Sequence, residues 1–260
     1  MKNRYCITSL ISVIILSAAS NILAESNSGV SNNQLFNTES KYTEESFPFS
    51  ELDIPDDVRK RFAALDTLPP PILLNTQVYF DWRLMGGVTP AKNQLPCGSC
   101  WDFAATGAFE SALLINDGIL WDLSEQQVLS CNAEGYNCDG GWMDGVWNLF
   151  MGYGAIEESD MPYQADDNIP CTQENYVPVA HLIGFEDIPD NINAIKNALM
   201  TGPVTTAYLH SQDFQYNCYW RDPSNYLNHF VMIVGWDDTM CSGHGAWIVK
   251  NSIGPEHGDN

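Results

Sequence analysis

Positive charge is scarce in this chain. Its 260 residues contain 11 Lys and Arg against 33 Asp and Glu, which gives a formal net charge of −22 at pH 7. Such a charge repels nucleic acid and anionic membrane surfaces, so we expect neither as a partner. Solubility and tolerance of salt or acid explain this composition better than a dedicated basic partner does.

Long apolar runs, internal repeats and N-x-[ST] sequons are also missing, apart from one apolar stretch at the N-terminus. There Lys2 and Arg4 precede an apolar segment from Ile7 to Ala19, and Ala24 is a small residue suited to cleavage. The segment is too short to span a bilayer, and no stop-transfer sequence follows it. We therefore expect residues 1–24 to be a signal peptide and the protein to be secreted. A membrane anchor is the alternative, and no N-glycosylation is expected.

Cysteines, in contrast, are present in a number that matters for an exported protein. Disulfides persist in oxidising compartments, and Cys6 would leave with the signal peptide. An odd number then remains, so one thiol is free or pairs with another molecule. The spacing of Cys131 and Cys138 is wider than that of usual zinc ligands, and we expect no metal or cofactor. The remaining cysteines are Cys97, Cys100, Cys131, Cys138, Cys171, Cys218 and Cys241.

Composition changes near residue 78. Residues 25–50 are rich in Ser, Asn and Glu, Asp56–Leu65 could form a short helix, and Pro69 to Pro71 require an extended passage. Exposed extended backbone is what a processing protease needs. We therefore interpret residues 25–77 as a removable pro-segment, with a plain linker as the alternative, and residues 78–260 as the main domain.

Hydrophobic periodicity in the main domain changes from helical to strand-like along the chain. Helical spacing of apolar residues predicts a helix over Cys100–Asn116. A capping box formed by Ser124 and Gln127 predicts the start of a second helix, which runs through Ser130. Asn191 is the expected cap of a third helix, which ends before Gly202. This order predicts an α+β fold with a helical part, a strand-rich part and a cleft between them. The predicted strands are Val204–Leu209, His229–Trp236 and Ala246–Lys250.

Cys100 stands where a nucleophilic cysteine could be activated. A free thiol has a pKa of about 8.5, and a helix N-terminus or a nearby imidazolium lowers it. Cys100 begins the predicted long helix, and His229 begins a predicted strand far downstream. A fold with a cleft could bring the two side chains together.

The segment around Cys100 carries a family resemblance. Residues 94–101, Gln-Leu-Pro-Cys-Gly-Ser-Cys-Trp, resemble the active-site segment of papain-like cysteine peptidases of the papain and cathepsin type. The match is ordered and runs from about residue 78 to residue 258. It implies a papain-like two-lobed α+β fold, with a helical N-terminal lobe, a β-rich C-terminal lobe and the active site between them. Further family-like segments are residues 80–83, 88–90, 123–127, 138–141, 228–237 and 247–252.

The resemblance also implies roles for four residues. Cys100 would attack the scissile carbonyl, and His229 would take up and later donate the proton. Asn251 would hold the imidazole in position, as the third member of such triads does. Gln94 would donate a side-chain N–H to the oxyanion, beside the backbone N–H of Cys100.

Substrate contacts follow from the same resemblance. It places Gly140 and Gly141 against the substrate backbone and predicts an apolar residue at P2, two residues before the cut on the acyl side. The alternative is that the apolar residues of this pocket are ordinary core residues. The pocket would be lined by Trp142, Met143, Ala207 and Phe230.

The resemblance suggests two disulfides, Cys97–Cys138 and Cys131–Cys171. With Cys100 left as the free thiol, Cys218 and Cys241 remain for a third. Each would contribute about 2–4 kcal/mol to stability.

Three features depart from the family pattern. Ile253 occupies a position where a Trp usually shields the asparagine, and Asp102 occupies one where a small residue is usual. We expect Ile253 to loosen the bond between Asn251 and His229, and Asp102 to raise the pKa of Cys100 if it faces the thiol. The chain also ends soon after the asparagine segment, so residues 78–260 are expected to be a fragment or a natural truncation of the domain.

The leading hypothesis is a secreted cysteine endopeptidase that works through an acyl-enzyme on peptide or protein substrates. It would be a monomer, with a protein inhibitor as a further partner. A catalytically impaired pseudoenzyme that binds peptides is the first alternative, and a transglutaminase-like acyltransferase is the second. A redox pair of Cys97 and Cys100 is disfavoured because no βαβ pattern surrounds it.

Overall fold

The computed structural model describes residues 12–20, 54–65, 67, 69, 71–74, 77–210 and 227–255. Its helices are α1 (Asp56–Leu65), α2 (Cys100–Asp117), α3 (Glu125–Cys131), α4 (Asp144–Gly152) and α5 (Ile192–Leu199). Its strands are β1 (Ser12–Ser20), β2 (Tyr79–Asp81), β3 (Ala180–Ile188), β4 (Val204–Tyr208), β5 (His229–Asp237) and β6 (Ala246–Lys250). Short 3₁₀ turns cover Trp82–Met85, Gln173–Asn175 and Cys241–Gly243.

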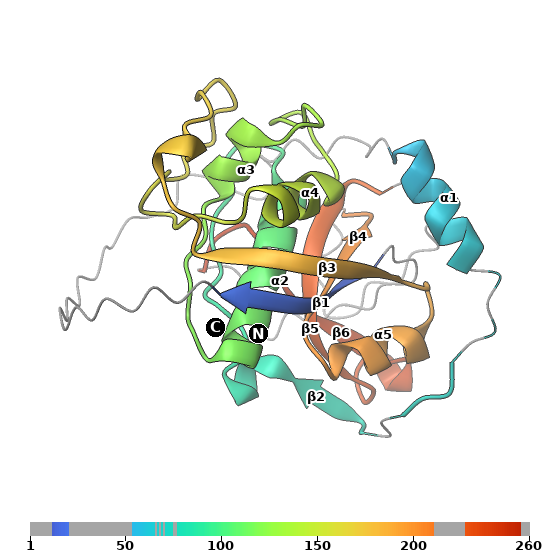
Figure 1. The fold of residues 1–260 in the computed structure, drawn as a ribbon. Helices are drawn as coiled ribbons and strands as arrows, with labels where there is room; N and C mark the ends of the chain where they lie inside the picture. The colour runs from blue at the N-terminus through green and yellow to red at the C-terminus, as the bar shows by residue number, and fades with distance from the viewer. Residues whose placement is uncertain are drawn as a thin grey trace.

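Helix α2 lies at the centre of the molecule. It contacts α3 and α4 on the helical side and strands β5, β4 and β1 on the sheet side (Figure 1). Every residue from Cys100 to Leu113 is buried, as expected of a helix that is covered all round. Gly118, with a φ of 70°, ends the helix and donates its N–H to the Leu114 carbonyl.

The sheet is antiparallel and holds strands in the order β2-β5-β4-β1-β3, with β6 paired to β5 outside this path. Strand β5 is buried along its whole length, which explains its almost continuous run of apolar residues. In the register, Tyr208 of β4 faces His229 of β5, and Met232 of β5 faces Lys250 of β6. The pairing therefore brings the start of β5 and the end of β6 to the same edge.

Strand β1 lies between β3 and β4 and pairs with both. It belongs to the segment that we expected to be a signal peptide, and the rest of residues 1–24 lies outside the described ranges. Removal of this segment on export would take a strand out of the sheet and leave the facing edges of β3 and β4 unpaired. The removal of residues 1–24 as a signal peptide stays a prediction.

Most of the predicted elements are present. Helix α2 and strands β4, β5 and β6 match their predicted ranges to within one residue at each end, and Asn191 caps α5 with its side chain. The α+β fold class is confirmed. The capping box is only half formed, because the Ser124 hydroxyl accepts from the Gln127 N–H while the Gln127 amide bonds Gly154 and Gln173 instead.

Helix α4 and strands β1, β2 and β3 were missing from the prediction. Helix α4 has Met143 at its N-cap with no side-chain cap bond, so it lacks the usual start signal.

In the described ranges no helix combines the length and the apolar character needed to cross a bilayer. The predicted flexible region at residues 25–50 lies outside those ranges.

Candidate functional site

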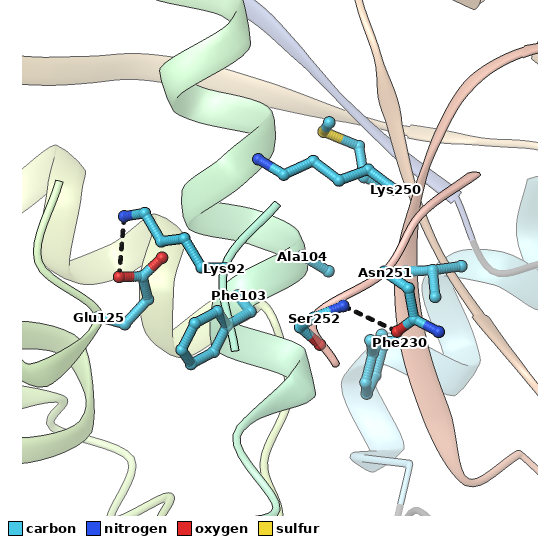
Figure 2. Close-up of a pocket in the computed structure, with 10 residues that line it drawn as sticks. Lys92, Phe103, Ala104, Glu125, Phe230, Lys250, Asn251 and Ser252 are labelled. Carbon is cyan, nitrogen blue, oxygen red and sulfur yellow. Dashed lines mark hydrogen bonds and ion pairs between the residues drawn. The ribbon is translucent and has the colours of Figure 1, made fainter. Parts of the chain in front are cut away.

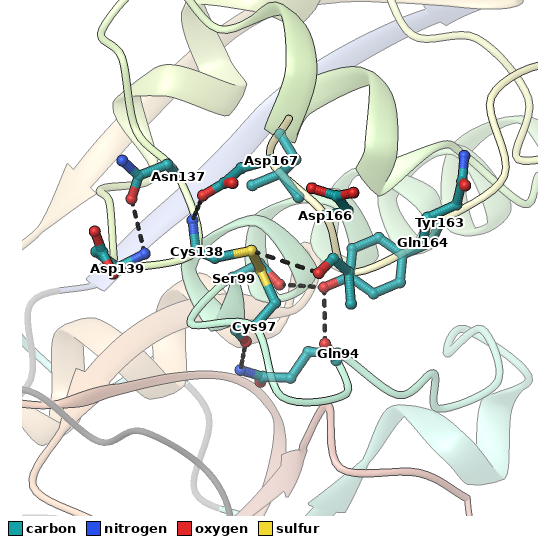
Figure 3. Close-up of a disulfide and its surroundings, with 12 residues drawn as sticks. Gln94, Cys97, Ser99, Asn137, Cys138, Asp139, Tyr163, Gln164, Asp166 and Asp167 are labelled. Carbon is teal, nitrogen blue, oxygen red and sulfur yellow. Dashed lines mark hydrogen bonds between the residues drawn. A yellow bond between two sulfur atoms is a disulfide. The ribbon is translucent and has the colours of Figure 1, made fainter. Parts of the chain in front are cut away.

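The loop before α2 is held by a disulfide between Cys97 and Cys138 (Figure 3). Beside it, the Gly98 N–H donates to the Cys138 carbonyl at 2.8 Å. A Cβ on residue 98 would lie 2.5 Å from that carbonyl oxygen, so only glycine fits this close approach. The disulfide therefore fixes the start of α2 next to Gly140 and Gly141.

Cys100 is the first residue of α2 and is 5% exposed. Of the cysteines that the structure describes, Cys100 is the one whose thiol is not in a disulfide. Burial raises the pKa of the Cys100 thiol to about 11, and hydrogen bonds from the backbone N–H groups of Phe230, Trp101 and Cys100 itself partly oppose this rise. Phe230 directly follows His229, so β5 brings the histidine to the N-terminal end of α2.

His229 lies beside Asn251, with its Nε2 2.8 Å from the asparagine Oδ1. A carbonyl oxygen only accepts, so Nε2 carries the hydrogen and Nδ1 is the basic nitrogen. Burial lowers the pKa of His229 to about 3, with the charge of His210 adding to this and the bond to Asn251 opposing it. Taken singly, the thiol and the imidazole are therefore both held in their neutral forms.

Gln94 is tied to the segment that follows β6. Its Oε1 accepts from the Ser252 hydroxyl at 2.6 Å, its Nε2 donates to the Cys97 carbonyl at 2.8 Å, and its backbone N–H donates to the Ser252 carbonyl at 2.8 Å. The Ser252 N–H also donates to the Asn251 Oδ1 at 2.8 Å. Ser252 thus links two predicted site residues, Gln94 and Asn251.

The predicted substrate pocket residues lie together across the two parts of the fold. The Trp142 ring meets the Phe230 ring edge-on, with centroids 4.9 Å apart, and Ala207 faces Phe230 in the sheet. Met143, like these three, is buried. Gly140 has a φ of 136° and pairs with Asn137, so it makes a turn that an L side chain would strain.

The second suggested disulfide, Cys131–Cys171, is also present. Cys241 is disulfide-bonded, and its expected partner Cys218 lies outside the described residues.

Ile253, the residue in place of the usual Trp, is buried with 6% exposure. In the ranges that the structure describes, no group of three His, Cys, Asp or Glu side chains could hold a metal ion.

Sequence reasoning missed Tyr163 and His210, because neither stands in a family-like segment. The Tyr163 hydroxyl lies 2.7 Å from Gln94 O and 2.7 Å from Ser99 Oγ. The His210 ring centroid lies 5.5 Å from that of His229, and its Nδ1 is bonded to the Tyr208 hydroxyl at 2.7 Å. Burial lowers the pKa of His210 to about 4, so it is neutral near pH 7.

A small pocket lies between α2 and α3 on one side and strands β5 and β6 on the other (Figure 2). Next to it the Lys92 ammonium contacts the carboxylates of Glu110, Asp122 and Glu125 at 2.9, 2.6 and 3.0 Å. Burial raises the pKa of Glu125 to about 8, and the charge of Lys92 opposes this only in part. Burial, and then the nearby Glu125 carboxyl, also raise the pKa of Asp102 well above its usual range.

This cluster predicts a loss of stability toward alkaline pH. In the unfolded chain Glu125 titrates near 4.3, whereas in the folded protein its pKa is about 8. The folded state therefore keeps a proton that the unfolded state has lost, and the free energy of unfolding falls as pH rises between these values. The fall is at most about 5 kcal/mol.

Urea denaturation of the full chain at pH 5 and pH 8 measures this effect. Glu125→Gln, a neutral side chain of the same shape, is expected to reduce the difference between the two pH values. Glu174→Gln is the control, because Glu174 is exposed. An equal difference in wild type and Glu125→Gln would contradict the assignment.

Comparison with known proteins places this geometry in a family. The model of the papain family of cysteine proteases matches residues 76–260. The chain is 34% identical over 189 residues to a senescence-specific cysteine protease of Arabidopsis thaliana, covering 70% of this chain and 54% of the relative. It is 35% identical over 204 residues to procathepsin L of Rattus norvegicus, covering 72% of this chain and 60% of the relative.

A solved structure gives the same result. The ragweed pollen cysteine protease Amb a 11 in its proform superposes with a TM-score of 0.64 at 32% identity, covering 77% of this chain and 66% of that chain. The matched region thus spans little more than half the length of the curated relatives. Family model, sequence and fold agree, and this chain belongs to the papain family of cysteine proteases.

Proposed function

We propose that this protein is a secreted cysteine endopeptidase whose catalytic triad is Cys100, His229 and Asn251. The observation that carries the proposal is the 2.8 Å contact between His229 Nε2 and Asn251 Oδ1, at the point where β5 meets the start of α2. This contact assigns the hydrogen to Nε2 and leaves Nδ1 to act as the base.

In the proposed reaction Cys100 gives its proton to His229 Nδ1, and the thiolate attacks the carbonyl carbon of the scissile bond. Burial disfavours each charge singly, but the two opposite charges form side by side and stabilise each other. The oxyanion accepts hydrogen bonds from the Gln94 side chain and the Cys100 backbone N–H. His229 then protonates the leaving amine, and water, deprotonated by His229, releases the acid from the acyl-enzyme.

Substrate choice is proposed from the pocket wall. Trp142, Met143, Ala207 and Phe230 are all apolar and buried, which favours an apolar side chain at P2. Their role as ordinary core residues is the alternative.

Hydrolysis of a fluorogenic peptide by the full-length chain tests the proposal. We expect activity that requires a reducing agent, is lost in Cys100→Ala and prefers leucine or phenylalanine over aspartate at P2. A folded wild-type protein that binds the peptide without cutting it would favour the pseudoenzyme alternative.

The pro-segment is proposed to restrain the enzyme through α1. Val58 and Phe62 of α1 are buried in the main core. Arg61 donates to Asp144 at 3.0 and 3.1 Å and to Asp187 at 2.8 Å. Asp144 directly follows Met143, so α1 is attached beside the candidate substrate pocket.

We expect Arg61→Ala to accelerate removal of the pro-segment about tenfold, because it deletes a partly buried contact to two carboxylates. Burial raises the pKa of Asp187 despite Arg61, so mild acid weakens this contact sooner than it would an exposed pair. Gel analysis with N-terminal sequencing measures the processing rate and locates both cleavage sites, including that of the signal peptide.

Arg59→Ala is the matched control, because Arg59 lies on the exposed face of the same helix. Equal processing rates in Arg59→Ala and Arg61→Ala would show that the contact does not hold the segment.

A further inference from the structure

Ser99 and Ser124 occupy the N-cap positions of helices α2 and α3 and behave differently. In α3 the Ser124 hydroxyl accepts from the Gln127 N–H at 2.9 Å, as an N-cap serine usually does. In α2 the Ser99 side chain makes no cap bond. Its hydroxyl lies instead 2.7 Å from the Tyr163 hydroxyl (Figure 3).

The direction of these bonds follows from chemistry. Tyr163 Oη is also 2.7 Å from the carbonyl oxygen of Gln94, which can only accept. The single phenolic hydrogen therefore goes to Gln94, and the Ser99 hydroxyl donates to Tyr163. The Ser99 side chain is thereby turned toward the tyrosine.

Tyr163 is held firmly in this place. Its ring meets Phe103 edge-on with centroids 4.8 Å apart, and its backbone N–H donates to Glu158 at 2.7 Å. Phe103 belongs to the same first turns of α2 as Cys100. Tyr163 thus packs on the helix whose start it contacts.

The orientation of the Ser99 side chain matters because it leaves the backbone N–H groups of the first turn of α2 without a side-chain cap. A capping Ser99 would bond the N–H of Trp101 or of Asp102. The Asp102 N–H already donates to the Ser99 carbonyl at 3.0 Å. A cap would therefore take the Trp101 N–H, which is one of the donors to the Cys100 sulfur.

We propose that Tyr163 is a positioning residue of the active centre. By holding the Ser99 hydroxyl it keeps the first amides of α2 for Cys100, and by bonding the Gln94 carbonyl it fixes the segment that carries the oxyanion donor. This inference rests on the proposed function, since it assigns Tyr163 to the same site.

The test follows the rate of Cys100 alkylation by iodoacetamide against pH in the full-length chain, with the modified peptide identified by mass spectrometry. Tyr163→Phe is expected to raise the midpoint of this profile by about one pH unit, because the released Ser99 hydroxyl competes for the Trp101 N–H. Peptide hydrolysis should lose about tenfold in kcat with KM unchanged.

The double variant Tyr163→Phe/Ser99→Ala separates the two effects. It has no serine hydroxyl to cap the helix, so the midpoint should return to the wild-type value. Its kcat should stay low, because the bond to Gln94 is still missing. Ser99→Ala alone should leave the midpoint unchanged, and it remains informative where Tyr163→Phe does not fold.

Tyr153→Phe is the matched control. The Tyr153 hydroxyl, like that of Tyr163, donates to a backbone carbonyl oxygen, and it lies 2.5 and 2.9 Å from the carbonyls of Gln173 and Tyr176, away from Cys100. This variant should lose stability without a change in midpoint or kcat. Because the proposed thiolate and imidazolium form as a pair and stabilise each other, a low wild-type midpoint is expected. A low midpoint that is unchanged in folded Tyr163→Phe, or shifted in Ser99→Ala, overturns this inference alone. A wild-type midpoint near that of an ordinary thiol contradicts the proposed function as well.

Discussion

Replacing Cys100 with alanine is expected to lower kcat/KM for peptide hydrolysis by about 10⁴-fold or more. The thiol is the group that forms the acyl-enzyme, and no other described cysteine has a free thiol to replace it. What remains would be the modest acceleration given by binding and by the oxyanion donors. The measurement is kcat/KM with a fluorogenic peptide that carries an apolar residue at P2.

The control for this variant lies on the same helix. Ser111→Ala also removes one heteroatom from a buried residue of α2, further from the proposed active site. It should keep its activity, and both variants should give the same circular dichroism spectrum as wild type. Hydrolysis that survives in Cys100→Ala would exclude Cys100 as the nucleophile.

Gln94→Ala is expected to lower kcat by about 10²–10³ with little change in KM, because an oxyanion donor acts mainly in the transition state. The Ser252 hydroxyl fixes the amide by donating to its Oε1 at 2.6 Å. One N–H of the amide is used on Cys97, and the second is left for the oxyanion. Steady-state kinetics with separate kcat and KM values test this expectation.

Gln126→Ala provides the comparison. Gln126 is equally buried and hydrogen-bonded, but its amide bonds Ser130 and Asp166 in the helical part. It should lower the free energy of unfolding without a fall in kcat. If Gln94→Ala raises KM alone, its amide binds ground state and transition state equally and is not an oxyanion donor.

Local signals explain why much of the fold could be predicted. Helix α2 ends where expected because Gly118 takes up the left-handed conformation that closes a helix. Strand β5 is a run of apolar and β-branched residues, and its burial is complete. Strand β3 was missed because Gly184 interrupts it and its burial does not alternate regularly. Asp102 lies two residues after Cys100 in the sequence, yet in the fold it interacts with the Glu125 carboxyl and the Lys92 ammonium.

The sequence by itself determined the family, the fold class and the residue types of the proposed triad, because these depend on short segments whose order along the chain is visible. Only the tertiary structure decided which polar atoms face one another around them. Ser252 reaches Gln94 across 158 residues, and Tyr163 reaches Ser99 across 64. Such bonds depend on how distant segments pack, and no local pattern encodes which way a hydroxyl will turn.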